Sequence, residues 1–141
     1  MRKLFHFDSP PGEYTSEACV VSCFDARFDL ALRKFLKRRG ITAPDHIKIA
    51  GAAKSLASPP DEAARGFVLD QMRLSLRRHG ARRAILFIHT NCGAYNGSYD
   101  TAFLTRELNQ AAACVRAAIP EMSVESYLMD FEGVWEADGA E

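Results

Sequence analysis

Four short apolar runs are spaced along the chain, separated by longer segments in which polar and apolar residues mix. The first run is ACVVSC at 18–23, and the others are HIKIAG at 46–51, AILFIH at 84–89 and VESYLMD at 124–130. A short, nearly all-apolar run with adjacent β-branched residues is typical of a strand buried on both faces. The pattern therefore predicts strands at these four positions.

The segments between these runs carry helical patterns. Residues 28–39 repeat apolar side chains on one 3.6-residue stripe, with basic side chains opposite and a glycine directly after. A second helix is expected from the Pro-Pro-Asp-Glu sequence at 59–62 through His79, where a glycine again follows. A third is expected over about 100–119, because a proline stands next.

The resulting order is β-α-β-α-β-α-β, which defines the expected fold class. Alternating strands and helices predict an α/β fold, with a mostly parallel sheet of about four to five strands and helices on both faces. No repeat or interdomain linker is visible in the sequence. We therefore expect residues 1–141 to form a single domain, with an irregular N-terminal segment over about 1–17.

Charge composition narrows the choice of partner. Eighteen Lys and Arg residues balance eighteen Asp and Glu residues, so the formal net charge is zero. No global field would draw such a chain to nucleic acid or to anionic lipid, and a small-molecule substrate suits it better. The N-terminus lacks the apolar run of a signal peptide, and no stretch has the roughly 20 apolar residues of a membrane helix. The expected location is cytoplasmic.

The four cysteines are expected to be reduced thiols, because the chain is not rich in cysteine and shows no secretory signal. Cys19 lies within the first predicted strand and Cys114 in the middle of a predicted helix, so both are expected in the core. Cys23 and Cys92 instead follow the first and third strands. These two remain as candidates for chemistry.

The carboxyl ends of the first and third strands carry the candidate site. In open α/β sheets, ligands bind outside these ends, where the strand order reverses. Cys23 stands at one of them, and His89 and Cys92 stand at the other. Two thiolates and one imidazole are ligands that Zn²⁺ prefers, and three protein ligands leave the fourth position open, as in catalytic sites. The pattern predicts one zinc site.

Two motifs resemble those of the β-class carbonic anhydrases: SCFDAR at 22–27 and HTNCGA at 89–94. The segment IKIAGAA at 47–53 is similar to that family's second strand and loop, and the resemblance extends over about 18–135. It implies a β-carbonic-anhydrase-like fold and Zn²⁺ held by Cys, His and Cys of the two motifs. It also implies reversible hydration of carbon dioxide to bicarbonate through a zinc-bound hydroxide.

Further roles follow for the neighbouring residues. Asp25 would orient the nucleophile, while Arg27 would hold Asp25 off the metal in a two-bond ion pair, as the family's Asp–Arg dyad does. Phe24, Phe28 and Tyr95 are candidate walls of a small substrate pocket, and the Gly93 N–H could donate to a bicarbonate oxygen. The histidines at 6, 46 and 79 are expected at the surface or at helix caps.

Other functions stay open at this point. The same zinc site could act on a related substrate such as carbonyl sulfide, because only pocket shape separates these molecules. The chain could also be a catalytically inactive zinc-binding or interaction module. Thiol redox chemistry by Cys23 and Cys92 is the weakest alternative, because the sequence has no C-x-x-C motif. A homodimer is expected by analogy with the family.

Overall fold

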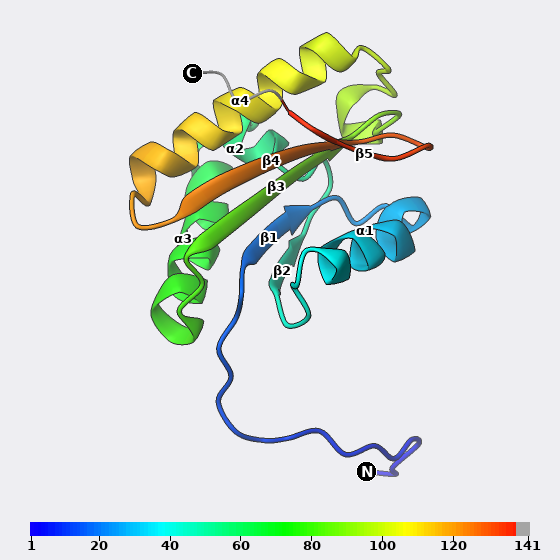
Figure 1. Cartoon of the computed structure of the whole chain (residues 1–141), viewed down its shortest axis with the longest axis vertical. Helices are drawn as coiled ribbons and strands as arrows, with labels where there is room; N and C mark the ends of the chain where they lie inside the picture. Colours follow the sequence, from blue (N-terminus) through cyan, green and yellow to red (C-terminus); the bar gives the residue numbers. More distant parts are fainter. Residues whose placement is uncertain (138–141) are drawn as a thin grey trace.

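Five strands form one sheet in the computed structural model, which describes residues 1–137. The sheet has the order β2-β1-β3-β4-β5, in which the first four strands are parallel and β5 is antiparallel to β4 (Figure 1). The strands are β1 (Cys19–Ser22), β2 (Asp45–Lys48), β3 (Arg83–His89), β4 (Ser123–Met129) and β5 (Val134–Glu136). The predicted mostly parallel α/β sheet is confirmed.

Each of the three long helices begins at an aspartate whose side chain accepts a backbone N–H of the first turn. These caps are Asp25, Asp61 and Asp100. The helices are α1 (Ala26–Arg38), α2 (Lys54–Ala57), α3 (Glu62–His79) and α4 (Thr101–Ala118), with a single 3-10 turn η1 (Gly93–Tyr95).

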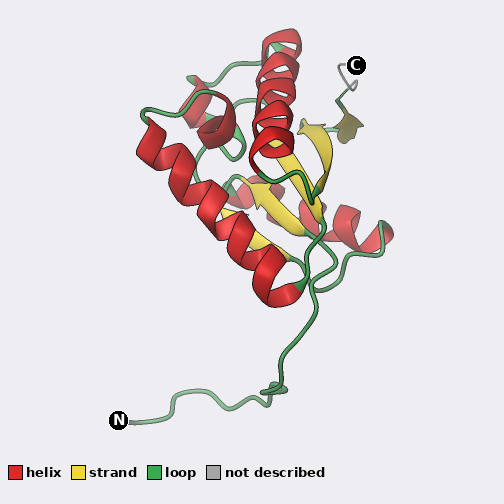
Figure 2. Ribbon diagram, turned by 90° about the vertical axis from the view of Figure 1, so that its left-hand side faces the viewer, coloured by secondary structure: helices red, strands yellow, loops and turns green. Residues whose placement is uncertain are grey.

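Helices cover both faces of the sheet, as predicted, but unequally. The cluster of α2, α3 and α4 buries one face through side chains such as Leu56, Met72 and Leu108. Helix α1 covers the other face through Phe28, Leu32 and Leu36. Figures 1 and 2 show α1 on one side of the sheet and the other three helices on the opposite side. The sheet is therefore an interior layer.

The second strand lies where predicted but is shorter. The sequence favours 46–51, whereas β2 ends at Lys48. The chain turns sharply after it, because Gly51 and Ala52 both have positive φ, at 78° and 52°. His46 was expected at the surface or a cap, and this is wrong: it is half-buried, with Nε2 2.6 Å from the Ser22 hydroxyl.

Residues 1–17 contain no helix or strand. Their first part extends away from the body of the molecule and exposes Leu4, Phe5 and Phe7 (Figures 1 and 2). Within the part of the chain that the structure describes, no helix combines the length and apolar composition needed to cross a membrane.

Candidate metal centre

The carboxyl ends of β1 and β3 lie side by side because these strands pair directly, in the register Cys19↔Ala84 to Val21↔Leu86. Cys23 follows β1, His89 is the last residue of β3, and Cys92 follows three residues later. The three candidate ligand atoms lie within 4.8 Å of one another. The structure thus brings together the three residues that the sequence indicated.

His89 is set up to coordinate through one particular nitrogen. Its Nδ1 lies 2.7 Å from the carbonyl oxygen of Thr90, so Nδ1 carries the proton and donates it there. Its Nε2 is buried and has no hydrogen-bond partner among residues 1–137. An unpartnered buried nitrogen costs about 1–3 kcal/mol, which a metal ion on that nitrogen would remove. This orphaned atom, facing two thiols, fits zinc.

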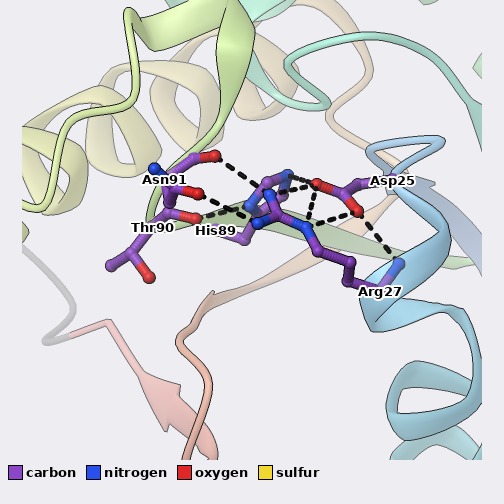
Figure 3. A network of polar contacts seen from close by, with 5 residues as sticks. All are labelled: Asp25, Arg27, His89, Thr90 and Asn91. Atoms are coloured by element: carbon purple, nitrogen blue, oxygen red, sulfur yellow. Dashed lines mark hydrogen bonds and ion pairs between the residues drawn. The ribbon is translucent and has the colours of Figure 1, made fainter.

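Asp25 and Arg27 form a tightly bonded pair beside the ligands (Figure 3). The Arg27 Nε donates to both carboxylate oxygens of Asp25, at 3.0 and 3.1 Å, and Nη2 donates to Oδ2 at 2.7 Å. These hydrogen bonds, with the Arg27 backbone N–H, lower the pKa of Asp25 to about 2. Asp25 Oδ2 lies 3.7 Å from His89 Nε2, so an ionised carboxylate stands at the edge of the ligand cluster.

Asn91 completes the pair from the other strand end, and sequence reasoning missed it. The Arg27 Nη1 donates to Asn91 Oδ1 at 2.9 Å, and Nη2 donates to the Asn91 carbonyl at 3.1 Å (Figure 3). Asn91 has a φ of 56°, a left-handed conformation that asparagine tolerates better than most residues. Its position between the two ligands of HTNC was the available signal. Arg27 therefore ties together the loops that follow β1 and β3.

Of the three aromatic residues expected near the site, Phe28 lies against His89. The ring of Phe28 lies 4.4 Å from that of His89, and Phe131 packs 5.1 Å from Phe28, centroid to centroid. Phe24 is 67% exposed. Tyr95 is buried, and its hydroxyl donates to Glu107 at 2.9 Å. Phe28 thus lies directly against His89, and Phe131, which was not anticipated, packs on Phe28.

The loop after β2 packs closely against the turn that follows Cys92. Gly93 begins η1 and is exposed, whereas Tyr95 at its end is buried. Gly51, in the loop after β2, lies against this turn: a Cβ there would be 2.9 Å from the Ala94 Cβ. The close approach requires glycine at 51.

The remaining cysteines lie outside the ligand cluster. Cys19 is fully buried in β1, and burial raises the pKa of its thiol to about 11. Cys114 is partly buried on α4 and packs against the core. Both belong to the core, as expected.

The sheet order, the crossovers and the three-ligand cluster define a β-carbonic-anhydrase-like protein. The chain belongs to the family described as "Putative carbonic anhydrase", whose pattern matches residues 14–137. Among curated proteins it is similar to uncharacterized proteins of Rickettsia bellii, at 24% identity, and Rickettsia conorii, at 23%. Each match covers 83% of this chain, with 78% and 69% of the respective relatives.

Solved structures show the same fold. A β-carbonic anhydrase of Trichomonas vaginalis matches with a TM-score of 0.64 at 15% identity, over 94% of this chain and 87% of that one. A carbonic anhydrase of Glaciozyma antarctica matches with 0.57 at 19% identity, over 90% and 85%. A carbon disulfide hydrolase in its apo form matches with 0.60 at 12% identity, over 90% and 82%.

Proposed function

We propose that this protein catalyses the reversible hydration of carbon dioxide to bicarbonate, with Zn²⁺ held by Cys23, His89 and Cys92. The observation that carries the proposal is the buried His89 Nε2, which has no partner and faces two thiols. Membership of the carbonic anhydrase family supports it. Zinc would supply a hydroxide-like nucleophile by acidifying a water near neutral pH.

Asp25 and Arg27 prepare that nucleophile. Because Arg27 keeps the pKa of Asp25 at about 2, the carboxylate is ionised at neutral pH and can accept a hydrogen bond from a water at the ligand cluster. Such a bond fixes the direction of the water's lone pair. Arg27 itself is anchored by Asn91. The dyad is thus held from both strand ends, and Asp25 cannot turn toward the ligands without breaking several hydrogen bonds.

The substrate would lie on the open side of the cluster. The exposed Gly93 would offer its backbone N–H to a bicarbonate oxygen. Phe28 provides an apolar surface against His89, which suits a small nonpolar gas. Phe24 and Tyr95 stay predicted as outer walls of this pocket.

The deciding experiment measures zinc per chain and carbon dioxide hydration by stopped flow on the same sample. We expect about one zinc per chain and hydration well above the buffer rate. Asp25→Ala should retain zinc and lose most activity, because Asp25 orients the nucleophile. Absence of zinc after growth in zinc-replete medium would overturn the metal site.

Zinc without turnover would instead identify an inactive zinc-binding module. Assaying the same sample with carbonyl sulfide and carbon disulfide separates a third outcome, a zinc hydrolase of a related substrate. The fold match to a carbon disulfide hydrolase makes this assay worthwhile.

A homodimer is part of the proposal. The N-terminal segment exposes Leu4, Phe5 and Phe7, a group of apolar side chains that a second copy could bury. Light scattering across micromolar concentrations should give the mass of two chains. A strictly monomeric mass would contradict this.

A further inference from the structure

A groove lies between α1 and the edge strand β2, apart from the ligand cluster. Its volume is about 760 Å³. The apolar part of its lining comes from Leu30 and Leu36 on α1 and from Ile41 and Pro44 in the connection to β2. Leu30 is 62% exposed, whereas Phe28, Leu32 and Leu36 of the same helix are buried. The groove therefore offers a contact surface that the described residues leave uncovered.

Positive charge gathers on the same groove. Arg33, Lys34 and Lys37 of α1 line it, all three are exposed, and none forms an ion pair with another residue of 1–137. Lys48 of β2 lines it too and pairs with Asp29. Lys37 lies in the last turn of α1, where the helix dipole favours a positive charge. The dipole does not account for Arg33 and Lys34, which lie nearer the middle of the helix. The groove thus has three uncompensated positive charges.

The open side of β2 adds backbone hydrogen-bonding groups. The strand pairs only with β1 among the described strands. The backbone N–H of Asp45 donates to the carbonyl oxygen of Ala18, and that of Ile49 donates to the carbonyl oxygen of Ser22, both at 3.0 Å. Because alternate residues of a strand face opposite edges, the backbone groups of His46 and Lys48 face away from β1. They are available to another strand.

His46 does not add to the charge of the groove. It is half-buried, and its Nε2 is engaged with Ser22 at 2.6 Å. Burial, with the nearby Lys48, lowers the pKa of His46 to about 4, so the ring is neutral at neutral pH. The charges that a partner meets come from the lysines and the arginine.

We infer that this groove binds an acidic polypeptide segment in an extended conformation, which adds as a strand to the open edge of β2. Carboxylates on such a segment would pair with Arg33, Lys34 and Lys37, while its apolar side chains would contact Leu30. A second copy of this chain is disfavoured, since a two-fold pairing of β2 edges would bring these cations close to their own copies. A nucleic acid would use the charges but neither the strand edge nor the apolar lining.

The probe is a fluorescein-labelled peptide in which Glu and Val alternate, titrated with the full-length protein at low salt and followed by fluorescence anisotropy. Arg33→Glu with Lys37→Glu should weaken binding by about tenfold or more, as expected for the loss of close charge pairs at an interface. The matched control reverses two exposed arginines elsewhere, Arg77→Glu with Arg116→Glu, and should change binding by less than about twofold. Lys34→Glu alone gives a milder variant that keeps the test decisive if the double variant unfolds.

Two N-methylated peptides test strand addition itself. Because a paired strand uses alternate N–H groups, methylating one alternate set should abolish binding, whereas methylating the other should leave it within about threefold. Equal effects would overturn strand addition.

Other results would also overturn the inference. These are no binding by the wild type, an equal loss in the control variant, or an equally tight and equally groove-dependent complex with oligothymidylate. A wild-type dimer that becomes monomeric on Arg33→Glu with Lys37→Glu would assign the groove to a second copy instead.

Discussion

Each end of the parallel sheet holds a polar network built around an aspartate. The two networks differ in whether all of their polar atoms have hydrogen-bond partners. At the amino end, Asp45 accepts hydrogen bonds from Tyr14 at 2.5 Å and Ser75 at 2.6 Å, and its Oδ2 lies 2.7 Å from His79 Nδ1. The rings of Tyr14 and His79 stack 4.0 Å apart. This network ties the N-terminal segment to β2 and α3, and its groups satisfy one another.

At the carboxyl end, Asp25 is equally well bonded, but the histidine beside it is not. Three buried side-chain polar atoms lack a partner in residues 1–137, and two of them, His89 Nε2 and Thr90 Oγ1, belong to this end. A network in which every polar group has a partner stabilises the fold. One that leaves the lone pair of a histidine nitrogen without a partner beside two thiols is suited to binding a ligand. The comparison thus separates an aspartate whose network is complete in itself from one that lies beside an unpartnered nitrogen.

The largest expected effect is loss of metal at the carboxyl end. Cys23→Ser or Cys92→Ser should reduce zinc from about one per chain to nearly none and lower thermal stability, because metal binding is coupled to folding. Metal analysis and thermal unfolding measure both. Cys114→Ser is the matched control and should retain zinc, and loss of metal there would show that the wrong thiols were assigned.

The second-largest effect is expected for Arg27→Ala. Without its partner, Asp25 is free to turn to the open position of the metal, so hydration should fall by about 10- to 100-fold at neutral pH with zinc retained. Arg27→Lys should rescue poorly, because an ammonium cannot form the planar two-bond pair. A pH–rate series with zinc checked at each pH tests this. Wild-type activity in Arg27→Ala would reject the dyad.

A substitution in the network at the amino end of the sheet should change stability without changing zinc content. Asp45→Asn should lower the free energy of unfolding by about 1–3 kcal/mol, the cost of disturbing a well-bonded and partly buried carboxylate, while zinc stays at about one per chain. Urea unfolding measures the first and metal analysis the second. Asp70→Asn, which breaks an exposed i,i+3 pair with Arg73, is the control and should change stability by less than about 0.5 kcal/mol. Loss of zinc in Asp45→Asn would erase the distinction between the two ends.

The smallest effect concerns pH. Burial opposes ionisation of Asp45, but hydrogen bonds from Ser75, Tyr14 and His79 outweigh it and lower the pKa of this carboxyl. A lowered folded-state pKa contributes stability above the unfolded value of about 3.9, and this is lost as pH falls through the folded value. The stability difference between wild type and Asp45→Asn should therefore persist at about pH 5 and shrink below about pH 4. A difference that does not change over this range would contradict the ionised role of Asp45.

The sequence predicted the elements whose patterns are long or unusually apolar. The run at 84–89 became β3 with one residue added, and residues 62–79 became α3, closed by Gly80. Two short elements, α2 and β5, escaped prediction, because they are too short to show a period and are not unusually apolar runs. The end of β2 was missed because Ile49 reads as strand, while the turn is imposed by the packing of Gly51 on the loop after β3.

The candidate ligands were predictable from topology, whereas the side chains around them were not. Cys23, His89 and Cys92 lie at or just after the carboxyl ends of two paired apolar strands, so topology alone places them together. Asn91 and Phe131 were not predictable in the same way. The first acts through contacts with an arginine 64 positions away, and the second reaches Phe28 from the turn after β4. Such contacts depend on side-chain directions that spacing does not encode.

The close approach of Gly51 to Ala94 leaves almost no space between two loops. With 2.9 Å between a would-be Cβ and the Ala94 Cβ, the clearance between the loop after β2 and the turn that follows Cys92 is that of a single hydrogen atom. Any added methyl group must push one loop outward, and the backbone at 51, with a φ of 78°, resists such a residue independently. The loop after β2 contributes no candidate ligand, but its contact at Gly51 limits how close the turn after Cys92 can come. A residue outside the candidate cluster therefore limits where the turn after Cys92 can lie.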